Sequence, residues 1–174
     1  MPFAPDAAAL AALLPGTWHV GATNSPVWLG GDRLRPQLHY DLKTADPLVL
    51  RDVVSYTTAR GVKKTIVGTD RLRRDRHAVN QNGVDQHDGN TFFWRGAGRL
   101  HFATRRWSVT GATEDSNILV IRFAKSMLTP AGVDVVVRDD TGSHAFRTQV
   151  AGLSESLGLS QGEFATLTWL EFAD

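Results

Sequence analysis

The chain has 174 residues, of which 42% are hydrophobic, so it is long enough for one domain with a sizeable core. Its 19 basic and 18 acidic residues nearly cancel, which argues against nucleic acid or an anionic membrane as a partner. The absence of cysteine excludes disulfides, thiolate metal sites and cysteine nucleophiles. We expect a single domain over residues 1–174, located in the cytoplasm and present as a monomer or homodimer.

The first predicted element is a short helix over residues 7–14. Asp6 is a plausible N-cap for this helix, and Pro15-Gly16 would end it. The apolar run lacks a basic segment before it, so we interpret it as part of the folded domain and not as a signal peptide. No apolar run approaches the roughly 18 residues that would span a membrane.

A first strand is predicted over residues 17–22, followed by a long loop over residues 23–36. The loop is rich in Asn, Pro and Gly, yet it contains the apolar run Val27-Trp28-Leu29. An apolar loop tip after the first strand could close one end of a barrel as a lid.

The middle of the chain consists of short strand-like stretches separated by turn signals. In the second stretch Leu38, Tyr40 and Leu42 share one face, and this period of two indicates a half-buried strand. The predicted strands cover residues 37–44, 50–60, 62–72, 91–95, 99–110, 117–125 and 133–138. Successive strands joined by short turns predict an antiparallel meander, and closure into a barrel would remove its exposed edges. A jelly roll or sandwich could use the same strands. The polar segment 73–90 is predicted as a loop.

The C-terminal region is less regular. A turn at residues 140–142 predicts a further strand over residues 143–150, and residues 151–159 are expected to form a short helix. Residues 164–172 fit either a closing strand or a terminal helix. We therefore expect an all-β domain of about eight or nine strands with helices only at the ends.

The sequence Gly16-Thr17-Trp18 opens the first strand, after a short helix and before a long loop. In these features, and in the strand meander, the chain resembles the lipocalin-like, or calycin, group of barrels. The resemblance implies an up-and-down barrel in which Trp18 plugs one end and an arginine from a late strand, Arg122 or Arg138, covers it. The chain lacks the signal peptide, the disulfide and the Thr-Asp-Tyr element of secreted lipocalins, which implies a divergent, bacterial and intracellular relative.

Aromatic side chains are the candidates for lining the lumen of such a barrel, which has room for one small ligand. They either form a ligand pocket or simply fill the core. The candidate residues are Trp28, Tyr40, Tyr56, Phe93, Trp94, Phe102 and Trp107.

Three polar side chains are candidates for chemistry if the protein is an enzyme. The hydroxyls of Tyr40 and Tyr56 could orient a ligand carbonyl or act as general acids, or could be satisfied core tyrosines. Arg122 interrupts an apolar strand, and a buried arginine must be paired or stacked. It would either cover Trp18 or clamp a ligand carboxylate.

Other chemistries lack their motifs. The six histidines show no metal-binding spacing, and neither a phosphate-binding loop nor a Gly-x-Ser-x-Gly elbow is present. We therefore expect no metal and no cofactor.

The sequence favours binding of a small hydrophobic or aromatic molecule in the lumen. The alternative is a cofactor-independent cyclase, isomerase or hydratase acting on a hydrophobic substrate resembling a natural product. Several polar groups converging on one cavity would favour chemistry, and a lone tyrosine would favour binding.

Overall fold

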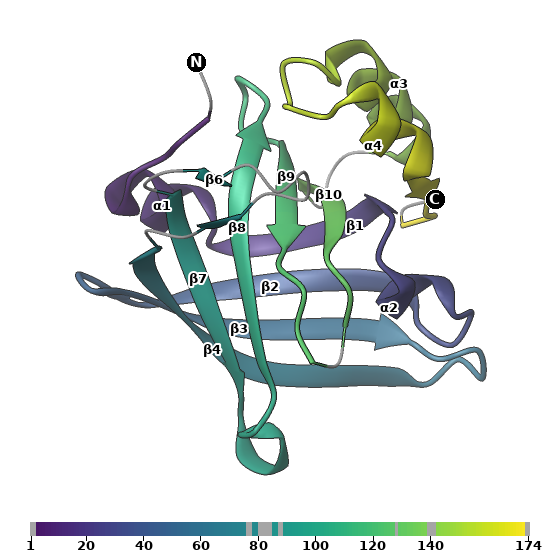
Figure 1. Ribbon diagram of the computed structural model, residues 1–174. Helices are drawn as coiled ribbons and strands as arrows, with labels where there is room; N and C mark the ends of the chain where they lie inside the picture. Colours follow the sequence, from purple (N-terminus) through teal and green to yellow (C-terminus); the bar gives the residue numbers. More distant parts are fainter. Residues whose placement is uncertain are drawn as a thin grey trace.

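Eight long strands close into an antiparallel barrel in the computed structural model, which describes residues 3–75, 78–79, 85–86, 89–127, 129–138 and 142–172 (Figure 1). The strands are β1 (Gly16–Thr23), β2 (Leu34–Ala45), β3 (Leu48–Thr57), β4 (Lys63–Asp75), β7 (Gly89–Gly96), β8 (Thr104–Ala112), β9 (Ile118–Phe123) and β10 (Gly132–Arg138). Each pairs with the next, and β10 pairs with β1 to close the barrel. The predicted meander and its closure are confirmed, and the sandwich alternative is excluded.

Several of the predicted strand boundaries shift in the structure. Strand β8 begins at Thr104 because the preceding residues form a 3-10 turn, η1 (Gly98–Leu100). In the predicted loop 73–90, β4 continues to Asp75, and the two-residue strands β5 (Ala78–Val79) and β6 (Asp85–Gln86) pair with each other. At the other end of the predicted loop, Gly89 and Asn90 already belong to β7, and residues 76–77, 80–84 and 87–88 lie outside the described residues.

Two short helices lie beside the barrel core. Helix α1 (Ala7–Leu13) is capped by Asp6, whose carboxylate accepts the Ala9 N–H at 2.8 Å. Its buried Leu10 packs into the interior core. Helix α2 (Pro26–Leu29) forms within the predicted loop and buries Trp28. Trp28 and Val27 of the apolar run pack against the interior core, whereas Leu29 is exposed.

The Gly-x-Trp motif is built around Trp18, which is fully buried. The Trp18 indole N–H donates to the Leu14 carbonyl at 2.9 Å. The Arg138 guanidinium lies 3.8 Å from the centre of the Trp18 ring and donates to the carbonyls of Leu13 and Pro15. Gly16 is required at its position because its φ is +116° and a Cβ there would lie 2.7 Å from an Arg138 nitrogen. Arg138, and not Arg122, is the covering arginine.

The C-terminal region forms a second layer outside the barrel (Figure 1). It contains α3 (Ser143–Leu153), α4 (Gln161–Thr166) and β11 (Thr168–Trp169), the last of which pairs with β1. The strand predicted over residues 143–150 is wrong. Phe146 and Val150, which are buried, are four residues apart and so lie on one side of a helix. Both alternatives for the segment 164–172 hold in part, because α4 ends at Thr166 and β11 follows it.

Two apolar cores result, one inside the barrel and one between its wall and the C-terminal layer. Strands β9 and β10 contribute to both, with Leu119 and Val136 facing inward and Val120 and Val135 facing the C-terminal layer. Burial on both faces explains why these strands are apolar along most of their length, with Arg122, Asp134 and Arg138 as the charged exceptions. Among the described residues, no helix is long and apolar enough to cross a membrane.

Candidate functional site

The interior of the barrel contains a cavity of about 160 Å³. An engineered apolar cavity of roughly 150 Å³ is known to hold one benzene molecule, so this space suits a single substituted ring. The lining residues come from six strands, the α2 region and the segment before β10. They are Val27, Trp28, Arg33, Leu38, Tyr40, Asp52, Val54, Ile66, Trp94, Arg105, Trp107, Phe123 and Thr129.

An aromatic stack forms one wall of the cavity. The rings of Tyr40 and Trp107 are stacked with 5.5 Å between centroids, and Phe92 stacks on Trp107 at 4.4 Å. The Trp107 indole N–H donates to the Asp70 carboxylate at 2.8 Å. Burial raises the pKa of Tyr40 well above its ordinary value, so its hydroxyl is neutral and able to donate a hydrogen bond.

A pair of buried carboxyl groups lies beside this stack. Leu50 on β3 is opposite Asp70 on β4, which places Asp52 one inward position farther along β3. Burial raises the pKa of Asp52 well above its ordinary value, and the charge of Asp70 raises it further. Burial also raises the pKa of Asp70, to about 7, although the Trp107 hydrogen bond opposes this. Near neutral pH the pair therefore holds a proton, and we assign it to Asp52.

Arg105 faces the same cavity from β8, directly opposite Trp94 on β7. Its guanidinium lies 4.1 Å from the centre of the Phe123 ring. Burial lowers the pKa of Arg105, while Asp134 and Asp52 act in the other direction. Arginine is the most basic side chain, so Arg105 remains a cation.

Asp134 connects helix α2 to the barrel wall. It accepts hydrogen bonds from the Thr23 hydroxyl at 2.6 Å and from the Trp28 indole at 3.0 Å. Burial raises the pKa of Asp134, and the two hydrogen bonds oppose that shift. Each carboxylate oxygen of Asp134 accepts one of these hydrogen bonds, so Asp134 links Trp28 of α2 to Thr23 of β1.

Several polar atoms at the cavity have no partner within the described part of the protein. Three belong to cavity-lining side chains, namely Asp52 Oδ1, Trp94 Nε1 and Arg105 Nε, and the fourth is Asp70 Oδ2. Gly68 explains where the Trp94 indole lies, because a Cβ at that position would be 2.1 Å from Trp94 Nε1. Buried polar atoms normally have partners, so this group is a candidate for contact with a ligand.

No family model matches the sequence, and no curated protein matches it. Solved structures match it across nearly the whole chain. Lobster apocrustacyanin A1 is 7% identical and has a TM-score of 0.58, with 94% of this chain and 79% of that one covered. The chain has a lipocalin-like fold.

Two further structures agree with this lipocalin-like fold. The amine binding protein of Rhodnius prolixus, solved as a tryptamine complex, is 13% identical with a TM-score of 0.59, and the match covers 97% of this chain and 84% of that one. The siderocalin Ex-FABP is 12% identical with a TM-score of 0.52, and 92% and 95% of the two chains are covered. Identities this low establish the fold alone.

Four of the predicted lumen residues line the cavity of the lipocalin-like barrel: Trp28, Tyr40, Trp94 and Trp107. Tyr56 does not line it, but its ring is 5.2 Å from the guanidinium of Arg33, which does.

Three other predicted positions are corrected by the structure. Phe93 lies on the outer face of β7, because neighbouring strand residues face opposite ways and Trp94 faces inward. Phe102 follows η1 and is 69% exposed. Arg122 also faces outward and forms an ion pair with Glu163 of α4, so it neither covers Trp18 nor reaches the lumen.

The acidic and basic residues of the lipocalin-like lumen were not among the predicted site residues. Asp52 is in phase with Leu50 and Val54, and Arg105 is in phase with Trp107. A charged residue among in-phase apolar neighbours was the available signal, because it predicts a buried charge.

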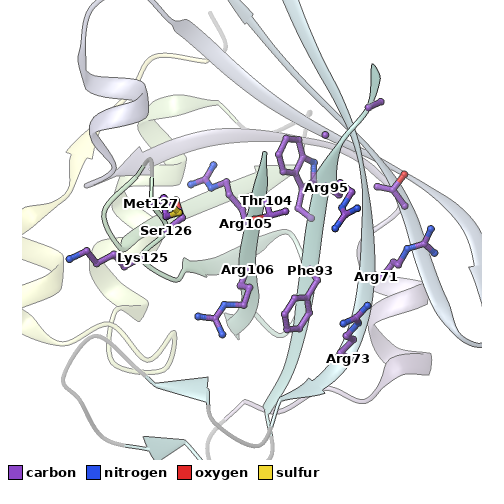
Figure 2. Close-up of a pocket in the computed structure, with 14 residues that line it drawn as sticks. Arg71, Arg73, Phe93, Arg95, Thr104, Arg105, Arg106, Lys125, Ser126 and Met127 are labelled. Atoms are coloured by element: carbon purple, nitrogen blue, oxygen red, sulfur yellow. The ribbon is translucent and has the colours of Figure 1, made fainter. Parts of the chain in front are cut away.

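A second hollow, of about 1150 Å³, lies on the outside of the barrel over β4, β7 and β8. Figure 2 shows Arg71, Arg73, Arg106 and Phe93 projecting from these strands. This basic concavity is lined mostly by outward-facing side chains, and it shares Trp94 and Arg105 with the lumen cavity. Among the described residues, no group of three or more His, Asp or Glu side chains could hold a metal ion.

Proposed function

We propose that the protein binds a small aromatic molecule inside the barrel. The observation that carries this proposal is the ring-sized cavity, which combines aromatic walls with three unpartnered polar atoms. Apolar walls favour binding by roughly 25 cal/mol for each Å² of apolar ligand surface removed from water. A few fixed polar groups then orient the ligand, as in most small-molecule sites.

The structural neighbours support small-molecule binding in general. One of them was solved with tryptamine, which contains an aromatic ring system, and the siderocalin is described as having dual ligand specificities. The size of the cavity supports a ligand of about one ring, since benzene occupies a cavity of roughly this volume.

The first test is native mass spectrometry of the freshly purified protein, followed by titration with one-ring aromatic compounds. Tryptophan fluorescence should report binding, because Trp28, Trp94 and Trp107 line the cavity. Val54→Phe would fill the cavity and should abolish binding. Val53→Phe is the matched control, because Val53 is the next residue on β3 and does not line the cavity. An equal effect of both variants, or binding that survives Val54→Phe, would contradict the lumen as the site.

A second candidate is the cofactor-independent enzyme, which the convergence of polar groups supports. Asp52, Trp94 and Arg105 face one cavity, with the Tyr40 hydroxyl on β2 beside them. Donors fixed around a carbonyl oxygen would stabilise an enolate, and the carboxyl pair would move a proton from Cα to Cγ of a β,γ-unsaturated ketone. The test is isomerisation of 3-cyclohexenone, followed by the absorbance of the conjugated product. A wild-type rate no higher than that of Asp52→Asn would remove this candidate.

A further inference from the structure

The charged groups of the lumen differ in how many hydrogen bonds and ion pairs they make with the rest of the protein. Asp134 accepts two hydrogen bonds, and Asp70 accepts one from Trp107. Arg105 is a largely buried cation that forms no ion pair with any carboxylate in the described residues. A buried charge without a counterion is costly, so an anion at this position would be favoured.

The side chains that face the cavity carry more positive than negative charge. Arg33 and Arg105 both line it, and the only carboxyl among the lining residues described is Asp52, which is neutral because of burial and its neighbour Asp70. Tyr40 is also neutral. Among the lining side chains described, a cationic ligand would therefore meet two like charges and no ionised carboxylate.

Two of the unpartnered atoms are hydrogen-bond donors on adjacent strands. Trp94 and Arg105 are directly opposite in the β7–β8 pair, and both face the cavity. Trp94 Nε1 and Arg105 Nε each carry one hydrogen that no described protein atom accepts. A group with two acceptor oxygens matches such a pair of donors, because a carboxylate accepts parallel hydrogen bonds.

We infer that the lumen ligand is an aromatic acid whose carboxylate binds Arg105 and Trp94 and whose ring stacks within the aromatic wall. This inference rests on the proposed function and specifies its ligand class. The ring would occupy the space beside Trp107, Tyr40 and Trp28. The acid would supply an ion-pair partner, which Arg105 lacks within the described part of the chain.

The test compares three probes of equal ring size by isothermal titration calorimetry at about pH 6: benzoate, benzamide and benzylamine. We expect benzoate to bind wild-type protein about tenfold or more tightly than either of the others. In Arg105→Met the affinity for benzoate should fall by about tenfold, and the affinity for benzamide should stay within about threefold. Arg106→Met is the matched control, because Arg106 is the next residue on β8 and lies over the outer hollow.

Two further variants test the same contacts if Arg105→Met does not fold. Arg105→Lys keeps the charge and should retain part of the preference for benzoate. Trp94→Phe removes one donor and should weaken benzoate more than benzamide.

The outcomes separate this inference from the proposed function. Equal binding of all three probes, or tighter binding of benzylamine, would overturn the aromatic acid while leaving an aromatic-binding lumen. Unchanged preference for benzoate in folded Arg105→Met would also overturn it. If none of the three probes binds wild-type protein, both proposals fail.

Discussion

Asp70 is fully buried, and burial raises its pKa to about 7. The same carboxyl in an unfolded chain has a pKa near 3.9. Between these values the folded protein holds a proton that the unfolded chain has released, so stability falls as pH rises from about 4 to about 7. Above pH 7 the ionised carboxyl costs the folded state on the order of 4 kcal/mol.

Replacement of Asp70 by Asn should therefore flatten the dependence of stability on pH. The amide still accepts from Trp107 and donates to Asp52, but it cannot ionise. Urea unfolding between about pH 5 and 8 would measure the change, with the Asp70→Asn variant gaining stability relative to wild type as pH rises. Asp41→Asn is the control, because Asp41 is 53% exposed and lies on the outer face. A wild-type profile retained in Asp70→Asn would contradict the titration of Asp70.

Gly68 leaves room for the Trp94 indole. An added Cβ would lie 2.1 Å from Trp94 Nε1 and 2.8 Å from the Arg95 carbonyl oxygen, so a methyl group must displace one of them. Gly68→Ala should reduce the free energy of unfolding by about 1–3 kcal/mol and weaken ligand binding. Gly152→Ala in α3 is the control, since a Cβ there meets no atom within 4 Å. Full stability and full affinity in Gly68→Ala would show that Trp94 is free to move.

At the scale of elements, strands of the barrel could be predicted because each has one face in the core. The period of two in Leu38, Tyr40 and Leu42 indicates β2 without any tertiary information. The same rule could have separated Phe93 from Trp94, since neighbours in one strand cannot both face the lumen. Which of the two faces inward depends on the register across β4 and β8, and one sequence does not supply it.

The elements that were mispredicted are those whose burial depends on a distant partner. Phe146 and Val150 have helical spacing, but the apolar surface that they cover is the outer face of the barrel wall at β1, β9 and β10. The residues of the segment 143–150 do not by themselves indicate that surface. Arg122 and Arg138 are both candidates to cover Trp18, and only the register decides between them. Arg138 pairs directly with Trp18, whereas Arg122 lies beside Glu163.

The contact between α1 and the barrel depends on Trp18. Trp18→Ala would leave a cavity under Arg138 and would remove the hydrogen bond to Leu14. We expect a loss of about 3–5 kcal/mol in the free energy of unfolding, the range for deleting a large buried aromatic side chain. Trp169→Ala, which truncates a half-buried indole in the C-terminal layer, should cost less. Equal losses in chemical denaturation would contradict the role of Trp18 as the barrel plug.

At the scale of the molecule, the two apolar cores lie on opposite faces of the wall formed by β1, β9 and β10. The C-terminal layer packs on the outside of that wall through Phe146, whose ring lies where a Cβ of Gly21 would be. The lumen cavity lies on the inside. The described residues that line the cavity from β2, β3, β4, β7 and β8 do not belong to the outer core.

Stability and ligand binding should therefore respond separately to changes in the two cores. Phe146→Ala should lower the free energy of unfolding by about 3–5 kcal/mol, because a fully buried ring is removed. The folded fraction should still bind benzoate within about twofold of wild type, since the altered site shares no partner with the lumen. Val54→Phe should do the reverse and abolish binding with a smaller effect on unfolding. Urea denaturation and calorimetry on both variants would measure this, and a large loss of affinity in folded Phe146→Ala would mean that the C-terminal layer controls the lumen through the shared wall.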